Sequence, residues 1–144
     1  RRQQTSQGVC KYIAMYIKDF DKWNEMQKHL NSVDEQVNIR AGEVRWVAFG
    51  INVGSEIDGK GVSFTRPALI THVVGSNLAL VVPLSTKVKE ITGYVPFEFQ
   101  GRIVSLCIHQ SRTISQKRIL ARKGKISEKR LDEVKKEIKK FFAL

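Results

Sequence analysis

The sequence predicts a mainly β domain with helices at both ends, an α+β protein organised around a small barrel. A series of short runs rich in Val, Leu, Ile and aromatic residues lies between residues 42 and 109, separated by Gly-containing turns. Apolar residues recur at helical spacing before these runs and after them. Isolated polar residues stand where the predicted strands begin or end, as in a rigid scaffold that presents a site on its loops.

Length and composition fit one soluble globular domain with a core. The chain has 144 residues, of which 42% are hydrophobic and 27% charged. Its apolar runs are far shorter than the roughly 18 residues that a membrane-spanning helix needs. The opening RRQQTSQG leads into no continuous apolar stretch of the kind that a secretion signal contains. We therefore expect a cytoplasmic protein without a membrane partner.

The net charge of +11 is concentrated in the larger part of the chain. Residues 42–144 carry 18 basic and 9 acidic side chains, whereas residues 1–41 carry 7 and 5. A sequence pI near 9.9 with the excess on one part favours binding to a polyanion such as nucleic acid over a merely solvated basic surface.

Cysteine and histidine positions predict neither a metal site nor a cofactor. Cys10 and Cys107 lie far apart, whereas a closed zinc site needs about four ligands at close spacing. Buried thiols in a reducing compartment are the better interpretation. His29, His72 and His109 are scattered, and the sequence contains no phosphate-binding Gly loop, no H-E-x-x-H and no G-x-S-x-G.

Residues 5–31 read as an amphipathic helix with Thr5 or Ser6 as its cap. We expect its apolar stripe to dock on the chain's own domain, because an exposed aromatic patch would otherwise remain. Residues 32–41 form a polar connector, so we divide the chain into a helical extension (1–41) and a barrel domain (42–144). The stripe consists of Val9, Ile13, Tyr16, Ile17, Phe20, Trp23 and Leu30.

The predicted strands are EVRWVAFG (43–50), ALITHVV (68–74), LALVVPL (78–84), YVPFEF (94–99) and RIVSLCIH (102–109). In the first strand both faces are largely apolar, as expected in a barrel. The Gly75-Ser76-Asn77 turn predicts an antiparallel hairpin, and Gln100-Gly101 marks another turn. Pro83 lacks a backbone N–H, so its part of the strand should lie at an edge or an end.

The C-terminal part is predicted to be helical. Ser115 should cap a short helical turn through QKRILAR (116–122), which Gly124 would end. Ser127 should cap the helix EKRLDEVKKEIKKFF (128–142), whose glutamate in the first turn and lysines in the last suit the helix dipole. The buried stripe of this helix is predicted to be Leu131, Val134, Ile138 and Phe141.

A basic β scaffold without metal ligands suits RNA cleavage by the substrate's own 2′-hydroxyl. This reaction needs a proton acceptor, a proton donor for the leaving 5′-oxygen, and positive charge against the phosphorane oxygens. A guanidinium supplies a planar fork of donors for these oxygens. Arg66, Ser85 or Thr86, and Glu56 are the candidate arginine, hydroxyl and carboxylate.

Four segments at these residues resemble the PemK/MazF family of toxin endoribonucleases from bacterial toxin–antitoxin systems. GEVRWVAFGINVGSE (42–56) is similar to the family's opening strand and G-S-E loop. TRPALI (65–70) and VVPLST (81–86) are similar to its Arg-Pro strand and its P-L-T-S strand end. SLCIHQSRTISQKRI (105–119) is similar to the segment before its C-terminal helix. The resemblance covers residues 42–144.

The resemblance implies an SH3-like barrel of the PemK/MazF/CcdB type with a C-terminal helix, here with an extra N-terminal helix. It also implies a homodimer that cuts single-stranded RNA at a short motif without metal or cofactor. The products would carry 2′,3′-cyclic phosphate and 5′-hydroxyl ends, and a cognate antitoxin would block the activity. By position, the catalytic residues would be Arg66, Ser85 and Glu56, and the RNA-binding residues Thr86, Lys87, Gln110 and Arg112.

Three departures from the family pattern bear on these expectations. The loop 57–65 is longer than in short members, so it could remove Glu56 from the site or alter sequence preference. Ser85 replaces the commoner threonine but keeps the hydroxyl, and His109 stands where an acidic residue is common. Two alternatives stay open: a catalytically silent nucleic-acid-binding barrel, and a CcdB-like toxin that inhibits gyrase by binding protein.

Overall fold

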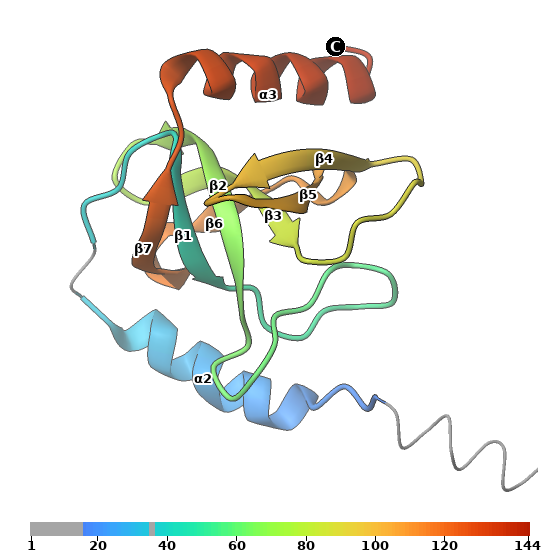
Figure 1. The fold of residues 1–144 in the computed structure, drawn as a ribbon. Coiled ribbons are helices and arrows are strands. Elements are labelled where there is room, and N and C mark those ends of the chain that lie inside the picture. Colours follow the sequence, from blue (N-terminus) through green and yellow to red (C-terminus); the bar gives the residue numbers. More distant parts are fainter. Residues whose placement is uncertain (1–15, 35–36) are drawn as a thin grey trace, which may run out of the picture.

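The computed structural model describes residues 16–34 and 37–144. Helix α3 lies across one end of a curved sheet, and helix α2 lies near the opposite end (Figure 1). Within the described residues, no helix is long and apolar enough to span a membrane. In chain order the elements are α2 (Phe20–Ser32), β1 (Glu43–Ala48), β2 (Thr65–Val74), β3 (Leu78–Ser85), β4 (Tyr94–Phe99), β5 (Arg102–Cys107), η1 (Ile108–Gln110), β6 (Arg112–Ser115), η2 (Gln116–Arg118), β7 (Ile119–Lys125) and α3 (Glu128–Phe141).

All strand pairs are antiparallel and form one sheet in the order β4-β5-β3-β2-β1-β7, with β6 also paired to β3. The predicted hairpin is present as β2–β3, and the turn predicted at Gln100-Gly101 joins β4 and β5 into a second hairpin. Within the described residues the two end strands, β4 and β7, do not pair with each other, so the sheet curves without closing. The mainly β architecture with a C-terminal helix is thus confirmed, and the barrel is an open one.

Strand β3 bends the sheet because it changes partner along its length. Leu78–Val81 pair with β6, whereas Leu84 and Ser85 pair with β5. Pro83 lies between these two segments and near the strand end, as predicted, although it is fully buried. Pro83 pairs with Ala68 of β2, and on its other side it lies between the residues that pair with β6 and those that pair with β5. The last residues of β3 therefore lie beside β5, and the strand ends at Ser85, directly before Thr86.

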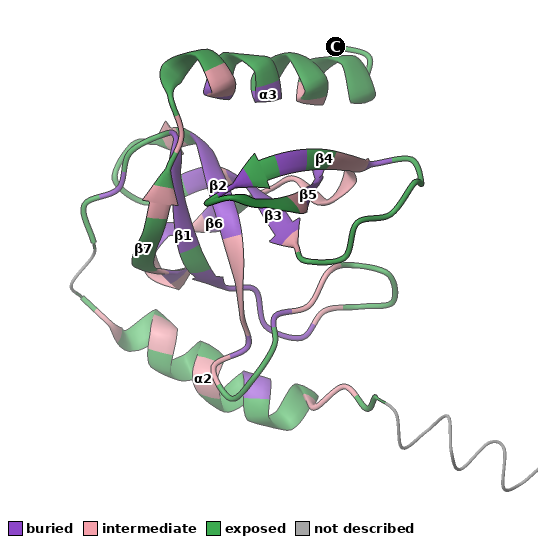
Figure 2. Cartoon of the chain, in the orientation of Figure 1, coloured by how far each residue is buried: buried purple, intermediate pink, exposed green. Residues whose placement is uncertain are grey.

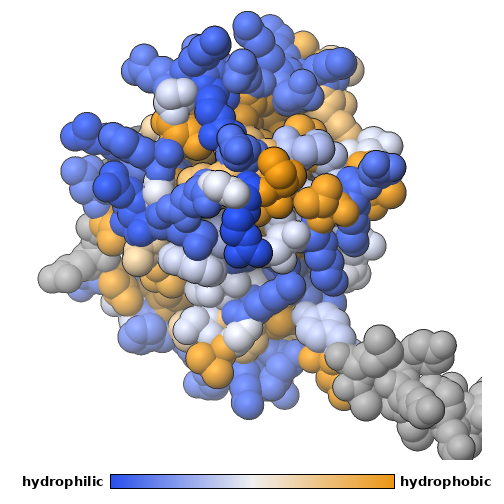
Figure 3. Space-filling model, viewed as in Figure 1, coloured by the Kyte–Doolittle hydropathy of each residue, from blue (hydrophilic) through white to orange (hydrophobic). Residues whose placement is uncertain are grey.

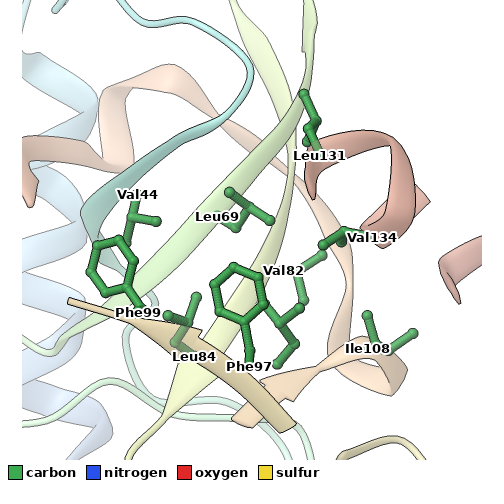
Figure 4. Packing of buried hydrophobic residues seen from close by; sticks show 10 residues of the cluster. Val44, Leu69, Val82, Leu84, Phe97, Phe99, Ile108, Leu131 and Val134 are labelled. Carbon is green, nitrogen blue, oxygen red and sulfur yellow. The ribbon is translucent and has the colours of Figure 1, made fainter. Parts of the chain in front are cut away.

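A main core cluster joins the sheet to α3. Phe97 and Phe99 pack with Val44, Leu69 and Val82, as Figure 4 shows. From the helix, Leu131 and Val134 enter the same cluster, and the Ser127 hydroxyl caps the helix by accepting from the Arg130 N–H at 3.2 Å. The outer side of α3 is exposed and hydrophilic (Figures 2 and 3). Phe141 is 38% exposed, so the predicted stripe ends at the partly buried Ile138.

Strand β1 contains a buried ion pair where largely apolar faces were expected. Glu43 and Arg45 are both buried, and their Oε1 and Nη1 atoms lie 3.1 Å apart. Arg45 also donates from Nε to the Leu120 carbonyl at 2.8 Å, and Glu43 accepts from the Arg40 N–H at 3.0 Å. A buried pair of charges is tolerated when such additional hydrogen bonds satisfy it. This network joins β1 to β7.

Within the described part of the predicted N-terminal helix, residues 16–31, only the residues from Phe20 onward are helical. Residues 5–15, with Thr5 and Ser6, lie outside the described residues. Tyr16–Asp19 are not helical, and α2 begins at Phe20, where the Asp19 carboxylate accepts from the Lys22 N–H at 3.0 Å. Tyr16, Ile17 and Phe20 are exposed, so the predicted single stripe is wrong for this part. The polar contacts of the segment with the domain, described below, replace helix formation.

Trp23 docks α2 on the domain, as expected. Its side chain is 5% exposed and meets the Phe64 ring edge-on, with ring centroids 5.6 Å apart. The Arg118 guanidinium lies over the indole at 5.5 Å. A Cβ at Gly50, whose φ is +79°, would lie 2.1 Å from the indole, so only glycine permits this approach. The division of the chain at residue 41 stays a prediction.

The segment after Ser115 is a strand rather than the predicted helix. Ser115 does cap a turn, since its hydroxyl accepts from the Lys117 N–H at 3.2 Å, but only the short η2 follows. The chain then extends as β7 along β1, with Gly124 opposite Val44. The open edge of β1 accounts for the difference, because pairing along it satisfies the backbone N–H and C=O groups of β1. The spacing of apolar residues in the sequence does not reveal this pairing. Strand β6 was also not foreseen.

Candidate active site

Arg66 and Ser85 lie next to each other because β2 and β3 are antiparallel neighbours. Ala68 pairs with Pro83, and the same register continued by two residues places Arg66 opposite Ser85. Directly opposite residues point to the same face, with Cβ atoms about 4.5–5.5 Å apart. Both side chains, together with Thr86, line a pocket of about 330 Å³. The strand pairing thus unites two of the predicted residues from separate sequence motifs.

Two backbone carbonyls hold the Arg66 guanidinium. Its Nε donates to the Asp58 carbonyl at 2.9 Å, and its Nη1 donates to the Leu84 carbonyl at 3.3 Å. The Arg66 side chain makes no other hydrogen bond to a described residue, so the remaining N–H groups of the guanidinium are available to an anion. Burial lowers the pKa of Arg66 from its ordinary value, because the charged form loses hydration.

The pocket combines cations with an apolar floor. Around Arg66 it is lined by further basic side chains and by aromatic and aliphatic ones. The Lys123 ammonium lies 5.1 Å from the centre of the Trp46 ring. This combination suits single-stranded nucleic acid, because cations bind its phosphates and aromatic faces stack on its bases. The basic lining residues are Lys60, Arg66, Arg102 and Lys123, and the apolar ones Trp46, Pro67, Leu84, Phe99 and Val104.

Hydrogen bonds fix the strand end that carries the predicted hydroxyl. The Ser85 Oγ accepts from the Lys87 N–H at 3.2 Å, which leaves its own O–H free to donate. The Ser105 hydroxyl on β5 donates to the Lys87 carbonyl at 2.8 Å. Lys87 lines a second hollow of about 590 Å³, which it shares with Arg66. Arg66 therefore stands between two adjoining hollows.

Glu56, Gln110 and Arg112 line a different hollow, of about 330 Å³. The Glu56 carboxylate accepts from the Val53 N–H at 2.9 Å within its own turn. Gln110 braces the same loop, since its amide donates to the Ser55 carbonyl at 2.9 Å and accepts from the Ile57 N–H at 3.1 Å. The structure does not bring Glu56 into contact with Arg66; the loop carbonyl of Asp58 contacts the guanidinium instead.

A scan against known protein families matches residues 40–142 to the PemK-like, MazF-like toxins of type II toxin–antitoxin systems. The chain belongs to this family. It is a toxin of the PemK/MazF type, and the family match extends over most of its length. No curated protein sequence gives a significant match.

Solved structures show the same fold. MazF (Form-I) from Deinococcus radiodurans is 19% identical, with a TM-score of 0.59 over 77% of this chain and 100% of that chain. MazE-MazF (Form-II) from the same organism is also 19% identical, with a TM-score of 0.54 over 74% of this chain and 96% of that one. The open, curved sheet with a C-terminal helix is thus the MazF fold.

Sequence reasoning missed Asp58, whose backbone carbonyl accepts a hydrogen bond from Arg66 in this toxin. The Asp58 carboxylate accepts from the Asn52 N–H and from the Tyr16 hydroxyl, both at 2.6 Å, and lies 3.4 Å from the Lys18 ammonium. Asp58 and Gly59 form a turn signal in the long loop 57–65, and this was the available clue. Tyr16 and Lys18 could not be found in this way, because they lie outside the family's segment.

The side chains of His109 and Cys107 pack within the domain. The His109 ring lies against Tyr94, with ring centroids 4.9 Å apart, and its buried Nδ1 has no hydrogen-bond partner among the described residues. Cys107 is fully buried, as predicted, and burial raises the pKa of its thiol. Cys10 lies outside the described residues. Within those residues, no three His, Cys, Asp or Glu side chains gather as a metal-binding group.

Proposed function

We propose that this toxin is an endoribonuclease that cuts single-stranded RNA at a short sequence motif without a metal ion. The observation that carries the proposal is the Arg66 guanidinium, oriented by two carbonyls and standing beside the Ser85 hydroxyl in a basic pocket. Membership of the PemK/MazF family supports the same reaction class.

In this reaction the substrate's 2′-oxygen attacks the adjacent phosphorus, and the bond from phosphorus to the 5′-oxygen breaks. A general base takes the proton of the 2′-hydroxyl, and a general acid gives a proton to the leaving 5′-oxygen. The products therefore carry a 2′,3′-cyclic phosphate and a 5′-hydroxyl. Arg66 would stabilise the charge that develops on the non-bridging oxygens, and Ser85 would donate a hydrogen bond to one of them. Burial lowers the pKa of Arg66 because the charged form loses hydration, but a guanidinium stays protonated, so Arg66 would act through its charge and its N–H donors.

Other predicted residues would contact the RNA on either side of the scissile phosphate. Thr86 borders the first pocket and Lys87 the second hollow beside Arg66. Gln110 and Arg112 would bind a neighbouring nucleotide in their own hollow. Glu56 is proposed to act there too, since its carboxylate contacts its own loop and not the arginine. These assignments divide the predicted residues between a reaction centre and a flanking subsite.

A homodimer and a cognate antitoxin are part of the proposal. The family is that of type II systems, in which toxins are paired with antitoxins, and one similar solved structure is MazE-MazF. Action on RNA would place the toxin in the cytoplasm, in agreement with the composition-based expectation.

The decisive experiment is cleavage of a long mixed-sequence single-stranded RNA in EDTA. We expect cuts at a recurrent short motif with cyclic-phosphate ends, and a loss of about a hundredfold to a thousandfold in rate for Arg66→Ala. Arg66→Lys, which keeps the charge but not the fork, should fall between the two. Lys136→Ala removes one exposed positive charge from α3 and should cut like the wild type.

Intact RNA with a folded wild-type protein, or equal cutting by Arg66→Ala, would refute the proposal. RNA binding without cleavage would favour the silent binding barrel. Absence of RNA binding would favour a protein target, and gyrase would be tested next.

A further inference from the structure

The segment Tyr16–Asp19 lies beside the candidate reaction centre, although it precedes the family's segment, which starts at residue 40. Tyr16 and Ile17 line the hollow of about 590 Å³ that also contains Arg66 and Lys87. The extension therefore adds side chains to a site that the domain of 40–142 would otherwise form alone.

Lys18 anchors the segment to the loop next to Arg66. Its ammonium donates to the Asn52 carbonyl at 2.6 Å and to the Gly54 carbonyl at 3.0 Å, and it lies 3.4 Å from the Asp58 carboxylate. These contacts engage the three donors of the ammonium. Lys18 is thus committed to holding the segment in place, and its charge is compensated within the protein.

Tyr16 has a fixed end and a free face. Its hydroxyl donates to the Asp58 carboxylate at 2.6 Å, while the residue is 59% exposed. Burial, with the hydrogen bond and the charge of Asp58, raises the pKa of Tyr16 to about 12, so the hydroxyl stays protonated and keeps donating at physiological pH. The carbonyl of the same Asp58 accepts from Arg66, which ties the ring position to the guanidinium.

The hollow around Tyr16 has the chemistry of a nucleotide subsite. Lys60, Lys87 and Arg66 supply positive charge along its wall, and Phe64 and Ile51 supply apolar surface. Two carboxylates also line it, but Asp58 is paired with Lys18 and Asp19 accepts from the Lys22 N–H. Its volume lies within the roughly 300–1,000 Å³ of small-ligand pockets. A rigidly held aromatic ring beside cations is how proteins bind the bases of single strands, because every base has a π-face.

We infer that Tyr16 is a substrate-binding residue whose ring stacks on one base of the RNA strand that is bound at Arg66. This inference rests on the proposed function and deepens it, since it adds a base-stacking subsite to the reaction centre. Lys18 acts as a positioning residue, because it holds the segment that presents the ring.

The test measures binding of a mixed-sequence 2′-O-methyl RNA, which cannot be cleaved because it lacks the attacking hydroxyl. Tyr16→Ala should weaken binding about tenfold, and Tyr16→Trp should restore it, because stacking needs a ring. Phe142→Ala removes an exposed aromatic side chain from the end of α3 and should leave affinity unchanged. Lys18→Met should reproduce part of the loss although the Tyr16 ring is intact.

Salt dependence separates stacking from charge. Tyr16→Ala should leave the slope of log affinity against log salt unchanged, whereas Lys87→Ala should reduce it, because only the lysine replaces counterions on a phosphate. With cleavable RNA, the KM of Tyr16→Ala should rise while its kcat stays within about twofold of the wild type.

Each outcome has a definite meaning. Equal or tighter RNA binding by Tyr16→Ala would overturn the inference, and tighter binding would show that the segment obstructs the site. Wild-type binding without any cutting of natural RNA would refute the proposed reaction, while the comparison of Tyr16 variants would still decide the stacking subsite. No binding by the wild type would overturn both.

Discussion

Replacing Trp23 with alanine tests whether one side chain holds the N-terminal helix on the toxin domain. Trp23 is the buried residue of α2, and it packs with Ala48, Ile51 and Phe64. Removing a buried tryptophan costs about 3–5 kcal/mol when its cavity persists. Within that total, the edge-on pair with Phe64 contributes about 0.5–1.5 kcal/mol and the contact with Arg118 about 0.5–1 kcal/mol.

In the variant, helix α2 can also detach from the domain. The loss of stability therefore cannot exceed the free energy with which α2 docks on the domain. Met26 and Leu30 are only partly buried and cannot hold α2 by themselves. We therefore expect a loss of about 3 kcal/mol in the free energy of unfolding, or a Tm lower by about 6–12 °C. Hydrogen exchange in α2 should rise much more than in β1 or β2, because the helix opens without the sheet.

Guanidinium denaturation followed by circular dichroism measures the loss, and Phe20→Ala is the matched control. Phe20 belongs to the same helix but is 49% exposed, so its replacement should change stability by less than about 0.5 kcal/mol. A loss below about 1 kcal/mol for Trp23→Ala, with unchanged exchange in α2, would refute the reasoning. It would mean that other contacts hold the helix.

Two more predictions concern neighbours of this helix. Gly50→Ala should destabilise the fold by about 3 kcal/mol, because it strains a residue at φ +79° and drives a Cβ into the Trp23 indole. In the background of Trp23→Ala, Gly50→Ala should cost less stability, because the indole is gone. Additive losses in the double variant would contradict the contact between residue 50 and Trp23. Tyr16→Phe should remove an absorbance titration with a midpoint of about 12. Because that folded pKa exceeds the unfolded value near 10, the stability linked to Tyr16 is complete below pH 10 and falls as the pH rises through 12; a midpoint near 10 would count against the hydrogen bond to Asp58.

Local sequence was sufficient where structure depends on neighbours along the chain. Ser127 and the acidic-to-basic order of residues 128–142 predicted α3, because capping and dipole interactions are local. For the same reason, the turn after β2 predicted the β2–β3 hairpin, and the turn predicted after β4 is the one that joins β4 to β5. The strand patterns and four short motifs also indicated the PemK/MazF family, to which the match over residues 40–142 assigns the chain.

The grouping of residues at the candidate site could be seen only in the fold. Arg66 and Ser85 are 19 positions apart in sequence numbering, yet β2–β3 pairing puts them on one face. Motif order could nominate both residues, but it could not show that Asp58 supplies the carbonyl for Arg66 or that Glu56 turns into its own loop. Such contacts depend on the conformation of a long loop, which cannot be predicted from the periodicity of the sequence.

The sequence by itself determined strands β1 to β5, the turns that join β2 to β3 and β4 to β5, the C-terminal helix and the basic character of this toxin, because periodicity, caps, turns and charge are properties of the chain. The tertiary structure decided that residues 119–125 form β7, since pairing with β1 outweighs their helical pattern. It also decided that Tyr16 and Lys18 leave the predicted helix, because Asp58 and the loop carbonyls offer them hydrogen bonds that lie more than thirty residues away. Interactions across that separation exist only after the chain has folded.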